Sequence, residues 1–351
     1  MRVTLEDVCE KGSSNLKQSD VINKTGAYPI YGAAGYLGNV DFYHQDKPYV
    51  AVVKDGAGIG RTTLHPAKSS VIGTMQYLLP KNNVLPEYLY YVVQYMHLEK
   101  YFTGATIPHI YFKDYKAEQF NLDAIERQKE IVASLQKVET LIKARQQQLQ
   151  KLDELIKARF VELFGDMFLN SKAWEERPLD LLAEVVSGIT KGRKTKEPQL
   201  TEVPYMAVSN VKDGYIDWTT VKTIQATQQE IEQYRLLPDD VLMTEGGDPD
   251  KLGRGAILKE PLENCIHQNH IFRVRLNESL ILPTFFAEYL KHQKAKRYFL
   301  GCAKQTTGIA SINMRQLKAL PVLLPPLELQ VQFASFVKQV DKSKLLYRKP
   351  P

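Results

Sequence analysis

The stretch IERQKEIVASLQKVETLIKARQQQLQKLDELIKARFVELFGD, residues 125–166, decides the fold. Its apolar residues recur at alternating spacings of three and four, which predicts a helix that packs against a second helix. At 1.5 Å per residue, about 40 helical residues span about 60 Å, more than a small globular domain covers. The predicted seam consists of Ile131, Leu135, Val138, Ile142, Leu149, Leu152, Ile156 and Leu163.

A shorter copy of the same pattern, LELQVQFASFVKQVDKSKLLYRKPP, occupies residues 327–351. An offset of 202 aligns Gln128 with Gln330. We expect the two helices to pair as an antiparallel coiled coil within the chain. The second copy has no counterpart to residues 149–163, so we expect that stretch of the first helix to face another subunit or a second copy of the chain. The second helix contributes Phe333, Val337 and Val340 to the predicted seam.

The segments before the two helices also repeat. LPEYLYYVVQYMHLEKYFTG from residue 85 matches LPTFFAEYLKHQKAKRYFLG from residue 282, and GIGR ending at Arg61 matches KLGR ending at Arg254. YPIYGAAG around Pro29 aligns with VPYMAVSN around Pro204. The offset grows along the chain, which predicts loop insertions in the second copy, one of them within residues 246–252.

Short β-rich runs such as YVAVVKDG predict strands, and Pro86 is typical of the first turn of a helix. The predicted fold class is therefore α+β, with α/β-like character: two similar globular domains separated by long helices. The predicted boundaries are residues 1–122 for the first domain, 123–168 for the central helix, 169–324 for the second domain and 325–351 for the shorter C-terminal helix.

Composition limits the functional class. The chain has 351 residues with a net charge of +6, which favours about two domains and is compatible with a polyanionic partner. Its three cysteines, Cys9, Cys265 and Cys302, are too scattered for a disulfide framework or a zinc cluster. The sequence has no apolar run of 18 residues and no signal-peptide pattern, so a cytoplasmic protein without a membrane segment is expected.

Basic and amide side chains lie beside glycine in several predicted loops. Arg and Lys can bind phosphate or guanine, and Asn and Gln can bind adenine. Each loop taken singly also fits a solvated surface; the densest basic run is SGITKGRKTK, residues 187–196. The candidate DNA-binding residues are Lys54, Arg61, Lys191, Arg193, Lys194, Lys196, Lys251, Arg254, Gln268 and Asn269.

Motifs that would give the chain chemistry of its own are incomplete. GAGIG at residues 56–60 lacks the spacing of a dinucleotide loop, and CIHQNH at residues 265–270 lacks the further ligands of a zinc site. The Pro-Pro pair at residues 325–326 is followed by leucine rather than by the aromatic residue of an amino-methyltransferase motif. We therefore expect a non-catalytic binding protein with no cofactor or metal.

The long motifs that lead into the two helices are the most distinctive feature. They read TGATIPHIYFKDYKAEQFNLDAIERQKEIV from residue 103 and TTGIASINMRQLKALPVLLPPLELQVQF from residue 306. Together with LFGDMF at residues 163–168 and the run from EGGDPDKLGRG to CIHQNHIFRV, they make almost the whole chain resemble the specificity subunit of a Type I restriction-modification system.

This resemblance implies two target recognition domains, each reading half of a bipartite site in duplex DNA. It also implies helices that space these domains and bind two modification subunits, which hold S-adenosylmethionine and methylate adenine N6. Restriction subunits would add cleavage that uses ATP and Mg²⁺. A prokaryotic, nucleoid-associated location follows, as does self-association through the unpaired part of the first helix.

Two other classes remain open at this point. A coiled-coil scaffold that binds proteins and no DNA would bind without dependence on salt, whereas phosphate contacts make DNA affinity fall steeply with salt. A stand-alone enzyme would need a convergent set of catalytic or metal-binding residues, which the sequence does not display.

Overall fold

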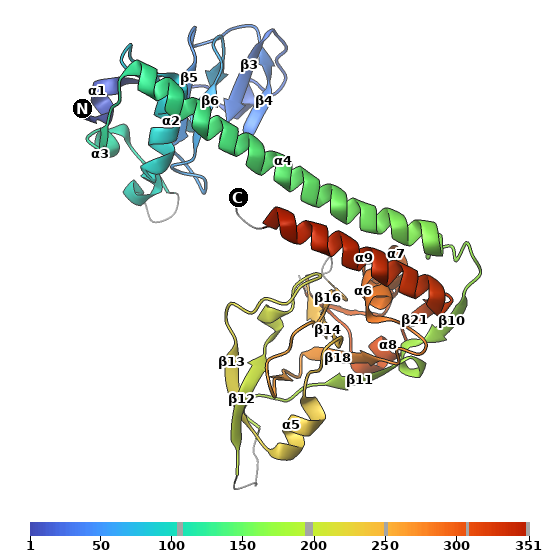
Figure 1. Ribbon diagram of the computed structural model, residues 1–351. Coiled ribbons are helices and arrows are strands. Elements are labelled where there is room, and N and C mark those ends of the chain that lie inside the picture. Colours follow the sequence, from blue (N-terminus) through green and yellow to red (C-terminus); the bar gives the residue numbers. More distant parts are fainter. Residues whose placement is uncertain (104–107, 194–198, 249–251, 307–308, 349–351) are drawn as a thin grey trace. The chain divides into compact units, whose positions relative to one another are not determined.

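The computed structural model describes residues 1–103, 108–193, 199–248, 252–306 and 309–348. The chain forms two compact units, Met1–Ala144 and Arg145–Pro351 (Figure 1). Helix α4 (Ile125–Phe164) is continuous across this division. Its first half therefore belongs to the first unit and its second half to the second unit.

The first unit contains a four-stranded sheet in the order β2-β8-β5-β6, a three-stranded sheet in the order β4-β3-β7, and the pair β1-β9. Strand β3 pairs antiparallel with β4 and parallel with β7. The strands are β1 (Arg2–Thr4), β2 (Cys9–Ser13), β3 (Tyr28–Gly32), β4 (Gly35–Val40), β5 (Tyr49–Val53), β6 (Thr62–His65), β7 (Ser70–Val71), β8 (Met75–Pro80) and β9 (Gln119–Asn121). The helices that accompany them are α1 (Leu5–Val8), α2 (Pro86–Tyr95) and α3 (Phe112–Tyr115), with short 3₁₀ turns at Gln18–Asp20 and Leu98–Tyr101.

Strand β5 reads YVAVV and is buried on both faces, which explains its continuous apolar run. Successive side chains of a strand point to opposite faces. Val50 and Val52 pack in one core with Leu89 of α2, whereas Tyr49 and Ala51 belong to a second core on the other face. Helix α2 begins with Pro86 in its first turn, as predicted.

The second unit repeats this topology. Its four-stranded sheet has the order β11-β18-β14-β16, its three-stranded sheet the order β13-β12-β17, and β10 pairs with β21. The strands are β10 (Glu175–Pro178), β11 (Ala183–Ser187), β12 (Thr201–Met206), β13 (Lys222–Ala226), β14 (Val241–Thr244), β15 (Gly246–Gly247), β16 (Gly255–Ile257), β17 (Ile266–His267), β18 (Ile271–Leu276), β19 (Lys304–Thr306), β20 (Ile309–Ser311) and β21 (Pro321–Leu324). The helices are α5 (Gln228–Tyr234), α6 (Pro283–Lys291), α7 (Gln293–Cys302), α8 (Met314–Lys318) and α9 (Leu327–Arg348), with 3₁₀ turns at Leu179–Leu181 and Val208–Asn210.

The orders of the four-stranded and three-stranded sheets described above correspond strand for strand, which confirms the internal repeat. The second unit has in addition a sheet in the order β15-β20-β19. Pro29 lies in β3 and Pro204 in β12, each the central strand of its three-stranded sheet. The last glycines of the matching GIGR and KLGR motifs share the left-handed conformation, because Gly60 has φ +81° and Gly253 has φ +73°. A Cβ on Gly60 would lie 2.6 Å from the backbone nitrogen of Glu99, and one on Gly253 would lie 2.3 Å from the ring of Phe299. Only glycine fits both turns without rearrangement.

Helix α9 packs antiparallel against the second half of α4 (Figure 1). Near the start of α9 the ring of Phe333 lies 5.3 Å from that of Phe160 and 5.6 Å from that of Phe164. Toward the end of α9, Lys344 forms an ion pair of 2.7 Å with Asp153. As residue numbers rise along α9 they fall along α4, so the predicted antiparallel pairing is present within the second unit.

The antiparallel direction changes which seam residues are covered. We expected residues 149–163 to lack a partner within the chain. In the structure Ile156 and Leu163 are instead buried in the core that contains Phe333 and Val340, and Leu152 and Val337 pack against that core. Leu149 is half-buried. The repeat offset aligns the starts of the two helices, but an antiparallel partner places its start against the other helix's end.

The first half of α4 has a different surface. Ile131 packs against the core of the first unit. Beyond it, Leu135 is 37% exposed, Val138 51% and Ile142 52%. We call Leu135, Val138 and Ile142 the exposed stripe of α4. The seam predicted from the sequence therefore splits into a packed part and an exposed part.

A buried glutamine fixes the first turn of each long helix to its own unit. Gln128 accepts a hydrogen bond from the Leu85 backbone N–H at 2.9 Å and donates to the carbonyls of Asn83 and Asp123, each at 2.9 Å. The side chain is fully buried, so these bonds replace water for the backbone groups around α2.

Gln330 makes the equivalent contacts in the second unit. It accepts from the Leu282 N–H at 2.8 Å and donates to the carbonyls of Leu280 at 3.1 Å and Pro325 at 2.9 Å. Gln330 is also fully buried. The alignment of Gln128 with Gln330 in the sequence therefore reflects one recurring structural role.

We expect Gln330→Leu to lower the free energy of unfolding of the second unit by about 2–3 kcal/mol, because it leaves three buried backbone groups without partners. Gln332→Leu is the matched control, since Gln332 lies two residues further along the same helix and is exposed. Urea denaturation followed by circular dichroism measures both changes. Equal stability of the two variants would contradict the proposed role of Gln330.

Candidate nucleic-acid interface

In the first unit, the loop between β5 and β6 meets the segment that follows α2. The Lys54 backbone donates to Thr74 and accepts from Ile110, at 3.0 and 2.9 Å. Beside it, the Asp55 carboxylate lies 2.5 Å from His109 Nδ1. We call this meeting point the hairpin junction of the first unit.

The second unit has an equivalent hairpin junction. The Glu245 backbone donates to His270 at 3.0 Å and accepts from Ile312 at 2.9 Å. The Glu245 carboxylate lies 2.5 Å from His270 Nδ1. The chain between β14 and β16 runs from residue 245 to 254, compared with 54–61 between β5 and β6, so the second copy is longer within the expected insertion.

Both hairpin junctions thus contain a histidine–carboxylate pair, although Glu245 occupies the position equivalent to Lys54 and Asp55 lies one residue further along. The two histidines come from different elements, since His109 follows α2 whereas His270 lies between β17 and β18. No sequence pattern indicated His109 or the two carboxylates. The alignment of GIGR with KLGR could have directed attention to this loop, but only the fold brings His109 and Asp55 together.

The candidate arginines of the two hairpins occupy equivalent positions. The Val53 N–H donates to the Arg61 carbonyl, and the Thr244 N–H donates to the Arg254 carbonyl. Arg61 is exposed, and its guanidinium donates to the Ala33 carbonyl.

The Arg254 guanidinium differs from that of Arg61. Its Nε is enclosed and has no hydrogen-bond partner among the described residues. Arg254 lines a cavity of about 290 Å³ together with Lys291 and Lys296, while Asp213 is the acidic residue of this lining. The cavity therefore carries an excess of positive charge.

The amide candidates flank the second hairpin junction. Gln268 Oε1 accepts from the Val208 N–H at 3.4 Å. Asn269 Nδ2 lies 3.4 Å from His270 Nε2, and both amide side chains are half-buried. Lys54 is also half-buried, at the first junction.

The basic run at residues 187–196 is only partly described. Lys191 is exposed. Arg193 is paired with Glu230 of α5 and also donates to the Gln225 carbonyl at 3.1 Å. The hydrogen bond between the Arg193 and Glu230 side chains raises the pKa of Arg193 and lowers that of Glu230. Arg193 therefore anchors α5, and the three remaining candidates, Lys194, Lys196 and Lys251, lie outside the described residues.

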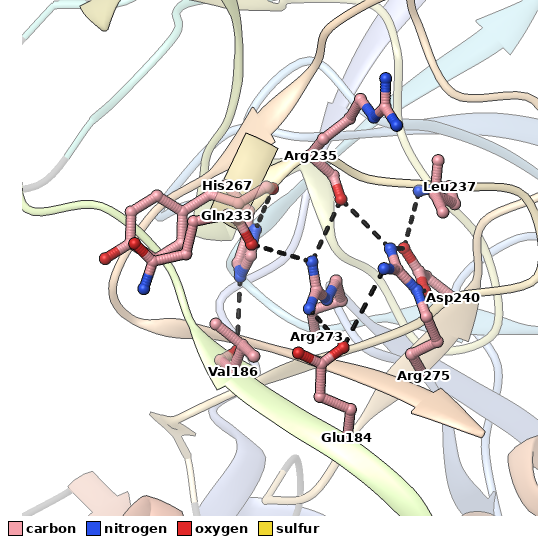
Figure 2. Close-up of polar contacts among 10 residues, drawn as sticks. Glu184, Val186, Gln233, Arg235, Leu237, Asp240, His267, Arg273 and Arg275 are labelled. Carbon is pink, nitrogen blue, oxygen red and sulfur yellow. Dashed lines mark hydrogen bonds and ion pairs between the residues drawn. The ribbon is translucent and has the colours of Figure 1, made fainter. Parts of the chain in front are cut away.

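A polar network around the buried Arg273 joins β18, β11 and the end of α5 in the second unit (Figure 2). Arg273 of β18 is 2% exposed and donates to the carbonyls of Gln233 and Arg235 at 3.1 and 3.2 Å, and to Glu184 at 2.8 Å. Burial lowers the pKa of Arg273. Its contacts fix the chain that leaves α5 against the four-stranded sheet.

Arg275 and Asp240 complete this network (Figure 2). Arg275 binds both carboxylate oxygens of Asp240, at 2.8 and 2.9 Å, and Asp240 also accepts from the Leu237 N–H at 2.7 Å. Asp240 is 1% exposed. The hydrogen bond to Asp240 raises the pKa of Arg275.

The first unit fills the same sheet positions with aromatic residues. Tyr77 lies opposite Ala51 in the β5–β8 ladder, as Arg273 lies opposite Leu242 in the β14–β18 ladder. Tyr77 accepts from the Val71 N–H at 2.8 Å, and its ring packs edge-on against Tyr49 with 5.0 Å between centroids. The shared fold thus tolerates two chemically different interiors.

His267 lies beside this network and is fully buried. Its Nδ1 is 3.1 Å from the Tyr234 carbonyl. Burial lowers the pKa of His267 to about 4. The folded unit therefore holds the ring neutral in the range where an unfolded histidine, with a pKa of about 6.5, takes up a proton.

Because the unfolded state binds more protons below pH 6.5, the second unit should lose stability as the pH falls from about 6.5 toward about 4. The contribution of His267 approaches roughly 3 kcal/mol at the acid end of this range. Hydrogen exchange of the β18 amides at several pH values measures it. The exposed His97, replaced as His97→Asn, should leave the profile unchanged, whereas a flat wild-type profile would contradict the assignment.

The residues of CIHQNH do not converge on one point in this fold. Cys265 and His267 are buried, whereas His270 is exposed and pairs with Glu245. Within the described ranges, no group of three or more His, Cys, Asp or Glu side chains could hold a metal ion. Over the same residues, no helix is long and apolar enough to cross a membrane.

Comparison with known proteins places this architecture. The chain is 31% identical over 169 residues to the putative type I restriction enzyme MjaX specificity subunit of Methanocaldococcus jannaschii, covering 48% of this chain and 39% of that protein. It is 25% identical over 139 residues to the Type I restriction enzyme EcoKI specificity subunit of Escherichia coli K12, covering 39% and 30%. The chain thus spans well under half the length of these curated relatives.

A solved structure shares the fold over nearly the whole chain. The S subunit of a Type I restriction-modification system from M. genitalium superposes with a TM-score of 0.61 at 16% identity, covering 99% of this chain and 91% of that chain. The family described as the Type I restriction modification DNA specificity domain matches residues 1–154 and again residues 171–349. Two copies of one domain therefore account for the strand-for-strand repeat, and the chain belongs to the family of Type I restriction modification DNA specificity domains.

Proposed function

We propose that this chain is the specificity subunit of a Type I restriction-modification complex and that each unit reads one half of a bipartite DNA site. The observation that carries this proposal is the pair of equivalent hairpin junctions, which share one backbone geometry but differ in side chains. One scaffold with different surface groups suits two readers of different half-sites. Family membership supports the same reading.

In this proposal the chain recognises the DNA sequence and assembles the complex, and other subunits carry out catalysis. The exposed stripe of α4 offers an apolar surface to a modification subunit or to a second copy of the chain. Two modification subunits would bring S-adenosylmethionine and methylate adenine N6. Restriction subunits would bring ATP- and Mg²⁺-dependent cleavage.

The test is a single-molecule methylome of DNA from cells that express this chain with its neighbouring modification subunit. We expect N6-methyladenine at one split motif, with both half-sites resolved. Methylation without a split motif would contradict a two-reader subunit. No methylation, together with salt-independent binding to partner proteins, would favour the scaffold without DNA binding.

The equivalent arginines provide a finer test. We expect Arg61→Ala and Arg254→Ala each to weaken DNA binding and to reduce the slope of log affinity against log salt by about one phosphate contact. Lys342→Ala, on the exposed surface of α9, is the control for a general loss of positive charge. Fluorescence anisotropy at several salt concentrations measures the slopes. Slopes equal to that of the wild type would exclude these arginines as phosphate contacts.

A further inference from the structure

We propose that His109 and His270 are base-reading side chains of the two half-sites, each held in one tautomer by its carboxylate partner. This inference rests on the proposed function and assigns specificity residues within it. The ligand of each histidine is an exocyclic amino group of adenine or cytosine in the major groove.

The carboxylate partner fixes the orientation of the His109 ring. An ionised carboxylate only accepts hydrogen bonds, so His109 Nδ1 must carry the proton that it donates to Asp55. In the neutral form of the ring, Nε2 is then an acceptor. Adenine N6 and cytosine N4 are the amino donors that the major groove displays.

The His109–Asp55 pair is partly accessible to solvent. The side chain of His109 is 37% exposed and that of Asp55 is 30% exposed. Among the residues that the structure describes, His109 Nε2 has no hydrogen-bond partner. Asp55 is therefore a positioning residue, and the ring nitrogen that remains available faces no competitor from the described part of the protein.

The histidine–carboxylate pair is not needed to hold the first hairpin junction closed. The backbone already does this: Gly56 donates to Pro108 at 3.0 Å, and Thr103 and His109 exchange two bonds of 2.8 Å. A pair that adds little to the closure of a loop, yet recurs at the second junction with a histidine from another element, has another use.

The surface around His109 carries an exposed aromatic ring and a cation. The ring of Tyr111, which is 50% exposed, lies nearly parallel to that of His109 with 6.3 Å between centroids. Lys113 Nζ sits over the Tyr111 ring at 5.4 Å. An oriented acceptor beside an exposed aromatic ring and a cation is a surface suited to a base edge and its phosphate.

The second hairpin junction also has an exposed histidine paired with a carboxylate, but from other positions of the fold. The side chain of His270 is 56% exposed and that of Glu245 is 33% exposed. Unlike His109 Nε2, His270 Nε2 already accepts a long hydrogen bond of 3.4 Å from Asn269 Nδ2, which a base amino group would replace on binding. Because the two histidines belong to different units, each should govern a different half-site.

The experiment uses the assembled complex with its modification subunits. Competition binding compares the wild-type split site with duplexes carrying each single-base substitution. We expect His109→Ala to reduce discrimination about tenfold at one position of one half-site, and His270→Ala to do so at one position of the other. The unaffected half-site reports that each variant is folded.

A base analogue tests the amino group directly. At the position relaxed by His109→Ala, adenine is replaced by purine, or cytosine by 2-pyrimidinone, which removes the amino group. The wild-type complex should lose about as much affinity on this replacement as His109→Ala loses on the natural site, and the variant should lose no more.

The controls separate the possible failures. His97→Asn removes another exposed histidine that pairs with a carboxylate, and asparagine tolerates the positive φ at that position, so specificity should not change. Unchanged discrimination in both alanine variants, or a uniform loss on every duplex, would overturn the inference while leaving the proposed function intact. A wild-type complex with no sequence preference would instead refute the proposed function.

Discussion

Replacing Phe333 with alanine is expected to lower the free energy of unfolding of the second unit by about 3–5 kcal/mol. Phe333 is fully buried, and its ring packs against those of Phe160 and Phe164. These two rings also contact Phe285 of α6, with centroids 5.5 and 4.8 Å away. Truncation therefore opens a cavity where α4, α6 and α9 meet. Urea denaturation followed by circular dichroism measures the loss.

Leu345→Ala is the matched control on the same helix. Leu345 is 58% exposed, so its truncation should change stability by no more than about 0.5 kcal/mol. A Phe333→Ala variant as stable as Leu345→Ala would show that α9 contributes little to the second unit. The expected result would show instead that the antiparallel helix pair is part of that unit's core.

The replacement Asp240→Asn is expected to destabilise the second unit by about 3 kcal/mol, because it removes the buried bidentate partner of Arg275 and leaves only the exposed Glu184 carboxylate, at 4.0 Å. Asparagine is isosteric with aspartate, but its amide nitrogen can only donate. It therefore cannot replace both acceptor oxygens that bind Arg275 and the Leu237 N–H. Thermal unfolding and urea titration measure the change.

Asp239→Asn provides the comparison at the neighbouring position. Asp239 has φ +66°, which asparagine tolerates, and its ion pair with Lys259 is exposed to solvent. Exposed pairs contribute little, so a change below about 1 kcal/mol is expected. If both variants lost equal stability, net charge rather than the buried network would be responsible.

The sequence predicted much of the architecture because repeated patterns survive in it. Pro86 and Pro283 lie in the first turns of equivalent helices, and the aligned Gln128 and Gln330 accept hydrogen bonds from equivalent backbone groups. The heptad spacing predicted that the two long helices pair, and the expected antiparallel pair is present within the second unit. The prediction that residues 149–163 lack a partner was wrong, because the repeat offset aligns the starts of the two helices, whereas an antiparallel partner places its start against the other helix's end.

The candidate site was harder to predict. Arg61 and Arg254 were found through the matching GIGR and KLGR motifs, and the fold places them at equivalent hairpin positions. Arg193 looked like a surface cation, but it pairs with Glu230 across 37 residues of sequence. A basic run does not reveal which of its members already has a partner.

The sequence by itself determined the twofold repeat, the long helices and the turn glycines, because these depend on local spacing and on the backbone angles that a residue allows. Only the tertiary structure decided that His109 meets Asp55, that His270 meets Glu245, and that a tyrosine pair and an arginine network occupy the same sheet positions. Those contacts join residues far apart in the chain. Their existence depends on how the sheets and the segments after α2 and β17 come together, which no local pattern records.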